Sequence, residues 1–574
     1  MADGFARRSG KPQCVIVHVD VGTQAMGAAV HNASTGRVPV LIFAGLSPMT
    51  AEGEMRGSRS EYIHWIQDVP DQKQIVAQYC RYTGEIRTGK NIKQMVNRAL
   101  QFATSDPAGP VYLTAAREVM EEEIRPYNLR QSLWGPAKSG ALPEEGLALI
   151  VDALVSANQP LIVVGYTGRN PTAVSGLVAL ADLIPGVRVL DTGGSHMCFP
   201  FSHPASVGMR YGVDPSITEA DFLLIVDCDV PYVPIRFRPR PDARIIHIDL
   251  DPLKQLMPLF YIDAQERYRA DSSIAFQQLR CYIADHPVYS KRVASEEFVQ
   301  RGEAVQRAHK ARIQGLNVLA EPSQDGGVTT PYLAASLRKL CPPVTLWVIE
   351  TVTQTFTVAD QLRTELPGTW FNSGGAGLGW SGGAALGVKL AEDFLAGGRG
   401  KGNFVCEVVG DGTFLFGGPS AAYWIAQCYG IATLTIVLNN KGKSFHTHVC
   451  SVLGPAAASH FFHRYLIEVS YLLLTGWNAP RHSLTVVHPH GEGSRVSNDD
   501  LHISFEPSPH YADIARAASG GHLWAGIVNS VDDLVKLLPE AIASVKGGVG
   551  AVVDVRLANA HAAGGFFTQR SIKL

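Results

Sequence analysis

The sequence predicts an α/β protein with three parallel-sheet domains in tandem. Apolar strand-like runs alternate with helix-length intervals along most of the chain, which is the pattern of parallel strands joined by helices. The chain has 574 residues, too many for one domain and suited to about three. Hydrophobic residues make up 46% of it, so each domain can bury a core. We therefore expect three units, at residues 1–135, 143–290 and 325–574.

The strands expected in these units are short apolar runs, most of them separated by helix signals. Those of the first unit are Cys14–Val19, Val38–Ala44 and Pro110–Leu113. Those of the second are Pro160–Gly165, Val187–Asp191, Phe222–Asp227 and Ile245–Asp249. Those of the third are Val344–Ile349, Phe404–Val409, Thr433–Leu438 and Ala551–Val555. A polar stretch with prolines before the second unit is typical of a linker, and charged helical sequence leads into the third.

Two strands of the third unit end on residues that can carry chemistry. One runs into Gly410-Asp411-Gly412 and the other ends at Asn439-Asn440. Because parallel strands end at one edge of their sheet, Asp411 and Asn440 bring a carboxylate and an amide oxygen to the same place. The glycines let main-chain N–H groups approach a phosphate at the positive end of the next helix. One charged and one neutral oxygen ligand suit Mg²⁺ held jointly with a diphosphate.

This pair of motifs resembles the signature of the thiamine diphosphate enzymes, although the gap between them is slightly longer here. An isolated Gly-Asp-Gly would also suit an ordinary strand–turn–helix, but the second motif favours the resemblance. The resemblance implies that Asp411, the side chain of Asn440 and the main-chain carbonyl of Gly442 ligate Mg²⁺. The residues that it places against thiamine diphosphate in this region are Gly410, Asp411, Gly412, Thr413 and Asn440.

The resemblance covers most of the chain. Residues 1–12 read MADGFARRSGKP, and residues 372–387 read NSGGAGLGWSGGAALG, both close to segments of the family. It implies a pyrimidine-binding domain (1–135, N-terminally incomplete), a central domain (143–290) and a diphosphate-binding domain (325–574). Within the family the chain looks most like the acetolactate, or acetohydroxyacid, synthases.

Two residues are candidates for catalytic roles by this resemblance. Leu378, between Gly377 and Gly379, matches the apolar residue that lies beneath the cofactor and wedges its two rings into a V shape. Gln67 matches a glutamine that reaches the cofactor across a dimer interface. The alternatives are a plain core leucine and a surface helix residue. With Gly377 and Gly379, Leu378 completes the predicted cofactor contacts.

The chain departs from the family pattern in two places. The family's catalytic glutamate, which activates the cofactor by proton transfer, lies shortly before the methionine that is Met1 here, so we expect an incomplete first domain and a compromised activation step. Residues 443–476 interrupt a segment that is continuous in relatives, and we interpret them as a retained intron. A real insert with a histidine metal site, at His446, His448, His460 and His463, is the alternative.

Composition excludes several classes of partner. The formal net charge is −2, which does not suit a nucleic-acid or polybasic membrane partner. The nine cysteines are scattered without Cys-x-x-Cys pairs, as in a reducing compartment. No targeting segment is visible, so we expect a cytoplasmic protein, with an organellar location left open.

Asp249 and Asp251 resemble a central-domain motif that lies at a nucleotide edge in some relatives, so FAD binding stays open.

The sequence therefore predicts a thiamine diphosphate- and Mg²⁺-dependent decarboxylase or carboligase that acts on a small-molecule 2-oxo acid. The activity would be like that of acetolactate synthase, as a homodimer or homotetramer, with no nucleic-acid or membrane partner. The alternatives are a simple 2-oxo acid decarboxylase, a 2-hydroxyacyl-CoA lyase, or a non-catalytic paralogue that binds the cofactor.

Overall fold

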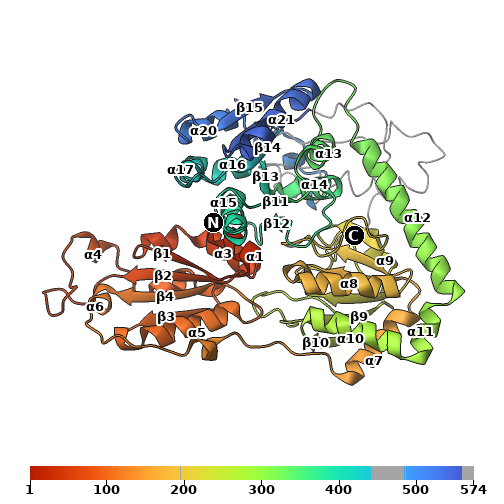
Figure 1. The fold of residues 1–574 in the computed structure, drawn as a ribbon, viewed down its shortest axis with the longest axis horizontal. Coiled ribbons are helices and arrows are strands. Elements are labelled where there is room, and N and C mark those ends of the chain that lie inside the picture. The colour runs from red at the N-terminus through yellow and green to blue at the C-terminus, as the bar shows by residue number, and fades with distance from the viewer. Residues whose placement is uncertain (194, 441–483, 485–486, 559–574) are drawn as a thin grey trace.

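Three parallel sheets covered by helices make up the molecule, which confirms the predicted fold class (Figure 1). The computed structural model describes residues 1–193, 195–440, 484 and 487–558. The predicted insert 443–476, its histidines and Gly442 lie outside the described residues. No helix among the described residues is long and apolar enough to cross a membrane.

The first sheet has four parallel strands in the order β1-β2-β4-β3. Its strands are β1 (Gln13–Val17), β2 (Val40–Leu46), β3 (Tyr82–Ile86) and β4 (Val111–Ala116). Its helices are α1 (Ala2–Ser9), α2 (Val21–Gln24), α3 (Gly27–Thr35), α4 (Ile63–Ile66), α5 (Ile92–Thr104) and α6 (Arg117–Met120). The sequence did not predict β3, because this edge strand contains Gly84 and Glu85 and is not an apolar run.

The central sheet has six parallel strands in the order β10-β9-β8-β5-β6-β7. Its strands are β5 (Pro160–Val164), β6 (Arg188–Asp191), β7 (Ser206–Met209), β8 (Phe222–Val226), β9 (Arg244–Asp249) and β10 (Glu266–Arg269). Its helices are α7 (Glu144–Ser156), α8 (Pro171–Leu183), α9 (Pro215–Glu219), α10 (Ser272–Asp285) and α11 (Pro287–Val293). The strand order reverses between β5 and β8, and in open α/β sheets the crevice at such a point is a usual ligand position.

The third sheet also has six parallel strands, in the order β12-β11-β13-β14-β16-β15. Its strands are β11 (Thr345–Glu350), β12 (Trp370–Asn372), β13 (Phe404–Gly410), β14 (Leu434–Asn439), β15 (Trp524–Val528) and β16 (Ala551–Arg556). Its helices are α13 (Thr330–Leu340), α14 (Thr355–Leu362), α15 (Trp380–Leu395), α16 (Asp411–Phe416), α17 (Pro419–Tyr429), α20 (Tyr511–Ala518) and α21 (Val531–Lys546). β11, β13 and β14 are buried along their whole length, as their continuous apolar runs predict.

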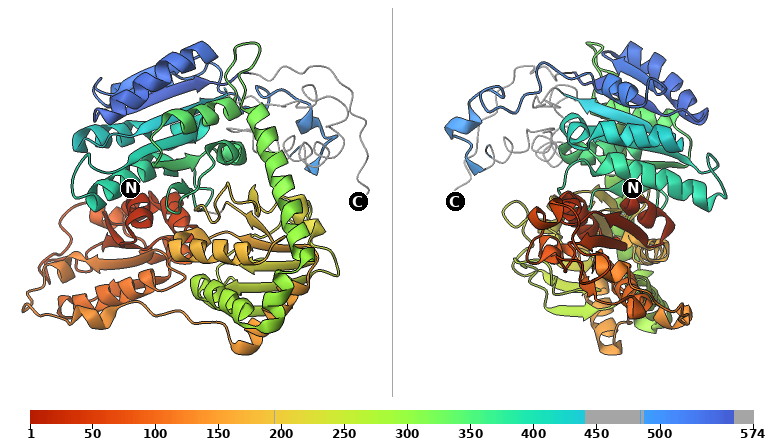
Figure 2. Two further views of the ribbon diagram at one scale, coloured as in Figure 1. Left: turned by 45° about the vertical axis from the view of Figure 1, so that its right-hand side comes forward. Right: turned by 90° about the vertical axis from the view of Figure 1, so that its left-hand side faces the viewer.

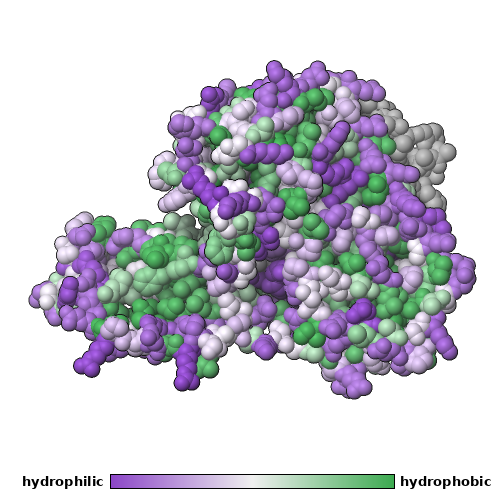
Figure 3. All heavy atoms as spheres, in the orientation of Figure 1, coloured by the Kyte–Doolittle hydropathy of each residue, from purple (hydrophilic) through white to green (hydrophobic). Residues whose placement is uncertain are grey.

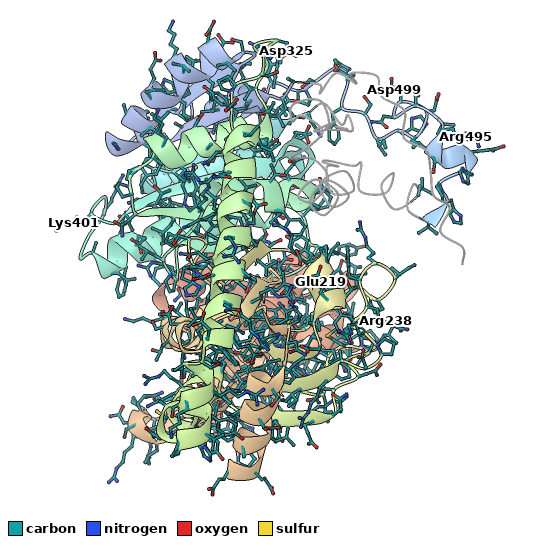
Figure 4. All side chains as sticks on the ribbon, turned by 90° about the vertical axis from the view of Figure 1, so that its right-hand side faces the viewer. Glu219, Arg238, Asp325, Lys401, Arg495 and Asp499 are labelled. Carbon is teal, nitrogen blue, oxygen red and sulfur yellow. The ribbon has the colours of Figure 1, made fainter. Side chains whose placement is uncertain are left out.

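Two helices join the domains. The long helix α12 (Glu296–Leu319) runs past the central and third domains (Figure 4), and Arg312 within it donates to the Ser206 carbonyl at 2.7 Å. The N-terminal helix α1 lies against α15 of the third domain (Figures 1 and 2). This contact is close because both helices use glycines there: a Cβ at Gly4 would lie 2.2 Å from the Ala384 carbonyl oxygen.

Candidate active site at the third sheet

Asp411 and Asn440 lie together at the carboxyl edge of the third sheet. β13 and β14 pair in parallel with Gly410 opposite Leu438, so both chains leave the sheet at the same level. One Asp411 carboxylate oxygen accepts from the main-chain N–H of Gly412 at 2.8 Å, and the other accepts from that of Asn440 at 3.2 Å. Both side chains are buried. The structure therefore brings the two residues that are predicted to ligate the metal together.

Beside this pair, a hydrogen bond holds the end of β14 in place, whereas the main chain at Gly410 has open space next to it. The Asn439 amide donates to Asp554 at 2.9 Å, which fixes the end of β14 against β16. Asp411 begins α16, which also contains Gly412 and Thr413. At Gly410 a Cβ would have Thr413 Oγ1 as its nearest neighbour, at 3.8 Å, so there is room beside the main chain. This edge can accept a ligand against main-chain N–H groups.

The glycine-rich stretch between β12 and α15 packs against α3 of the first domain. A Cβ at Gly374 would lie 2.3 Å from the Gly36 nitrogen, and one at Gly375 would lie 2.8 Å from the His31 ring. At Gly377 it would lie 2.8 Å from the Ala28 carbonyl oxygen. These glycines are thus required by the close approach of another domain of the same chain, a reason that the sequence alone did not reveal.

Leu378 lines a cavity of about 430 Å³ between the central and third domains. Its lining residues come from strand ends of both sheets and from the glycine-rich stretch: Tyr166, Thr192, Tyr211, Asp229, Val230, Glu350, Val352, Asn372, Ser373, Gly374, Gly375, Ala376 and Leu378. Val352 has φ 48°, a left-handed conformation that is uncommon for a β-branched residue. Leu378 therefore faces a hollow, as a residue beneath a ligand must.

Glu350, the last residue of β11, was missed by sequence reasoning. It accepts from the main-chain N–H groups of Gly379 at 3.1 Å and of Ser381 at 2.7 Å. Burial raises the pKa of Glu350 to about 7, although these hydrogen bonds lower it. An acid that ends an apolar strand at the carboxyl edge of a parallel sheet was the available signal.

Gln67 lies apart from this cavity within the described chain. It directly follows α4 in the first domain, its side chain is buried, and its Nε2 atom has no hydrogen-bond partner in the structure. The residues that line the cavity do not include it. Its predicted approach to the cofactor of a second subunit stays a prediction.

The corresponding edge of the central sheet is filled by charged side chains. Arg37, from the first domain, pairs with Asp229, lies 3.7 Å from Asp249 and stacks 4.3 Å over the Tyr166 ring. Lys254 pairs with Asp229 at 2.7 Å and also with Asp249. Burial opposes ionisation, but Arg37, His247 and Lys254 together hold the pKa of Asp249 well below its ordinary value.

Comparison with known proteins identifies the family. The thiamine pyrophosphate enzyme family matches in three parts: its N-terminal TPP binding domain at residues 1–75, its central domain at 147–256 and its C-terminal TPP binding domain at 351–460. Together these matches cover just over half of the chain. The chain belongs to the thiamine pyrophosphate enzyme family, and the predicted resemblance is confirmed.

Relatives within this family include two kinds of enzyme. Acetolactate synthase of Arthrospira platensis is 24% identical over 464 residues, which cover 76% of this chain and 72% of the relative. Benzoylformate decarboxylase of Pseudomonas aeruginosa is 22% identical over 453 residues, covering 77% and 76%. The solved thiamine diphosphate-dependent 4-hydroxybenzoylformate decarboxylase of Rhodococcus jostii RHA1 has the same fold, with a TM-score of 0.69 and 18% identity over 97% of this chain and 89% of that one.

Proposed function

We propose that this chain is a thiamine diphosphate- and Mg²⁺-dependent 2-oxo acid decarboxylase or carboligase of the acetolactate synthase type. The observation that carries the proposal is the pair Asp411 and Asn440 at the carboxyl edge of β13 and β14, inside the matched C-terminal cofactor-binding domain. The donor set, one carboxylate and one amide oxygen beside main-chain N–H groups, fits Mg²⁺ bound jointly with a diphosphate. Histidine or cysteine ligands are not needed, and among the described residues no group of three or more His, Cys, Asp or Glu side chains is arranged to hold a metal ion.

Each part of the site has a role in this proposal. When bound, thiamine diphosphate supplies the electron sink that decarboxylation of a 2-oxo acid requires. Asp411 and Asn440, with the carbonyl of Gly442, hold the metal, and Gly410, Gly412 and Thr413 present main-chain groups to the diphosphate. Leu378 supports the cofactor rings from the cavity wall, between Gly377 and Gly379. The cavity beside Leu378, of about 430 Å³, would receive the substrate.

The decisive experiment measures CO₂ release by the purified chain from pyruvate and from benzoylformate, with and without thiamine diphosphate and Mg²⁺. Release that needs both additions, with acetolactate formed from pyruvate, supports the acetolactate synthase type. Release from benzoylformate without a coupled product identifies a simple decarboxylase. Tight cofactor binding with no turnover of either substrate would instead show a non-catalytic paralogue.

A flavin dinucleotide does not fit the central domain as it is built. Its diphosphate would meet Asp227, Asp229 and Asp249 at the crevice between β5 and β8, where Arg37 and Lys254 are already paired. In the segment after β5, the main-chain N–H of Tyr166 donates to the Asp227 carbonyl at 2.7 Å, so this segment is tied to the end of β8. Titration of the purified chain with FAD should produce no quenching of flavin fluorescence.

The assembly proposed for the active protein is a homodimer or a dimer of dimers. Apolar side chains gather over the first sheet (Figure 3), and Ile16, Tyr62 and Trp65 in this domain are exposed. The unpaired, buried Nε2 of Gln67 lies directly after the helix that carries Trp65. Sedimentation should give at least twice the monomer mass.

The eight described cysteines are free thiols, which supports a reducing compartment such as the cytoplasm.

A further inference from the structure

The turn that carries Leu378 is held by two side chains from different domains. Asn32, in α3 of the first domain, donates from Nδ2 to the Gly377 carbonyl at 2.7 Å and accepts from the Gly377 N–H at 3.2 Å. Glu350, at the end of β11, accepts from the N–H groups of Gly379 and Ser381. The peptide units on both sides of Leu378 are therefore fixed from outside the turn.

Both side chains are buried, with 2% of their surface exposed, and this location is energetically demanding for Glu350. The N-terminus of α15 could be capped at much lower cost by a serine or an asparagine next to it in sequence. Instead the N-cap position is Gly379, with φ 89°, and the capping acceptor comes from a separate strand. The arrangement ties the orientation of the turn to β11, and thus to the sheet whose edge holds Asp411.

Asn32 provides the second attachment. Its amide makes a reciprocal pair of hydrogen bonds with Gly377, so both donor and acceptor are used and the geometry is defined in two directions. Because a Cβ at Gly377 would lie 3.0 Å from Asn32 Nδ2, glycine is also the residue that permits this approach. A shift of α3 would therefore move the Leu378 backbone directly.

We propose that Asn32 and Glu350 are positioning residues that fix Leu378 against the bound cofactor. The inference rests on the proposed function for the role of Leu378, but the clamp itself is a property of the protein without ligand. It assigns a role in the cofactor site to a residue of the first domain of the same chain. Misplacement of a supporting group by about 1 Å can reduce a rate about a hundredfold, so such a clamp has a measurable effect on turnover.

The first test is hydrogen exchange of the ligand-free protein. In Glu350→Ala the amides of Gly379 and Ser381 lose their acceptor, so their exchange should accelerate about tenfold or more while the later turns of α15 keep their protection. Asn32→Ala should do the same for Gly377. Unchanged exchange at these amides would overturn the proposal, whatever the protein catalyses.

Two matched controls separate the clamp from loss of any buried polar group. Glu118 is equally buried and accepts from the Thr50 N–H at 3.0 Å, far from this turn in the first domain. Asn97 makes a reciprocal amide pair with Gln131. Glu118→Ala and Asn97→Ala should leave the exchange of residues 376–381 as in the parent chain. If either control accelerates it equally, the effect is general loosening and the proposal fails.

The second test uses the protein loaded with thiamine diphosphate and Mg²⁺. Glu350→Ala and Asn32→Ala should retain the cofactor but change its near-ultraviolet circular dichroism, and kcat should fall about ten- to a hundredfold with little change in KM. Glu350→Gln keeps one acceptor oxygen and should restore part of both signals. Parent-like dichroism and kcat in both alanine variants would contradict the proposal. Failure of the parent chain to bind the cofactor would overturn the proposed function instead, leaving the exchange test to decide the clamp.

Discussion

The central edge, at the carboxyl ends of β8 and β9, and the third edge, at those of β11 and β13, lie in two similar six-stranded sheets, yet they are built from different groups. At the central edge, side chains of opposite charge pair with one another: Arg37 and Lys254 with Asp229 and Asp249. At the third edge, the carboxylates of Asp411 and Glu350 accept hydrogen bonds from main-chain amides in turns that contain glycines.

This difference explains why one edge joins domains and the other can bind a ligand. Paired side chains fill a crevice and cancel charge, and at the central edge one of them comes from another domain, so the crevice becomes part of a domain contact. Main-chain amides orient a carboxylate without filling the space in front of it, and they attract phosphate groups. Two sheets of similar topology therefore serve different purposes. Paired side chains make the central edge a domain contact, and main-chain amides leave the third edge open to a ligand.

The largest expected effect tests the domain contact. Arg37→Ala removes a buried cation and leaves Asp229 and Asp249 with Lys254 alone, so the free energy of unfolding should fall by about 3–5 kcal/mol. Urea denaturation measures it. Arg240→Ala, which breaks the exposed pair with Asp242, is the control and should leave the midpoint unchanged. An Arg37→Ala midpoint equal to that of the control would mean that the central edge is not a stabilising contact.

The next effect tests the ligand edge. Asp411→Ala should weaken thiamine diphosphate binding in the presence of Mg²⁺ by about a hundredfold or more, because the remaining neutral oxygens do not offset the charge of the diphosphate. Asp249→Ala, at the central edge and outside the residues that line the cavity, should leave that affinity within about threefold. Calorimetric titration of both variants gives the comparison. Equal losses in the two would show that the edges do not differ in the way described.

Glu350 and Asp249 should make contributions of opposite sign to the pH dependence of stability. The pKa of Glu350 is raised to about 7, so the folded state binds an extra proton between the ordinary glutamate pKa and 7, and stability falls as pH rises through that window, by about 1–3 kcal/mol. The pKa of Asp249 is lowered, so its contribution is present above the ordinary aspartate pKa and is lost as pH falls below it.

Urea denaturation between pH 3 and pH 8 distinguishes the two groups. Glu350→Gln should reduce the slope of the curve between about pH 5 and pH 7, to which Asp191 and Asp227 also contribute because burial raises their pKa values to about 7 and about 6. Asp249→Asn should change the slope only below about pH 4. A parent-like slope above pH 5 in Glu350→Gln would remove Glu350 as the source of that dependence.

The smallest expected effect concerns the glycine-rich stretch. Gly374→Ala should lower the free energy of unfolding by about 1–3 kcal/mol, since its Cβ would meet the main chain of Gly36 at 2.3 Å. Gly135→Ala is the control, because no heavy atom lies within 4 Å of its added Cβ and its φ is ordinary. Thermal denaturation of both variants is sufficient. Equal melting temperatures would show that α3 can move away without cost.

The sequence could predict features that depend on residues close together in the chain, but not contacts between residues of different domains. The strands around Phe404 and Thr433 are buried apolar runs, and the register of β13 and β14 then places Asp411 beside Asn440. Two of the missed edge strands, β3 and β10, are partly polar: β10, with sequence ERYR, is largely exposed. Neither the Arg37–Asp249 contact nor the Asn32–Gly377 pair has a local pattern, because each joins residues of two different domains that are far apart in the sequence.

The contact between α1 and α15 has a consequence for how the chain matures. The glycine face of α1 receives its partner only when Ala384 and Gly387, about 380 residues later, have been made. At translation rates of about 5–20 residues per second this wait lasts roughly 20–75 seconds. During that time α1, at the first sheet, lacks its packing partner α15. Asn32 in α3 likewise lacks Gly377, its hydrogen-bond partner. This part of the chain, made long before its partner, is thus among the last to reach its final structure, and it is there that a chaperone would find exposed surface.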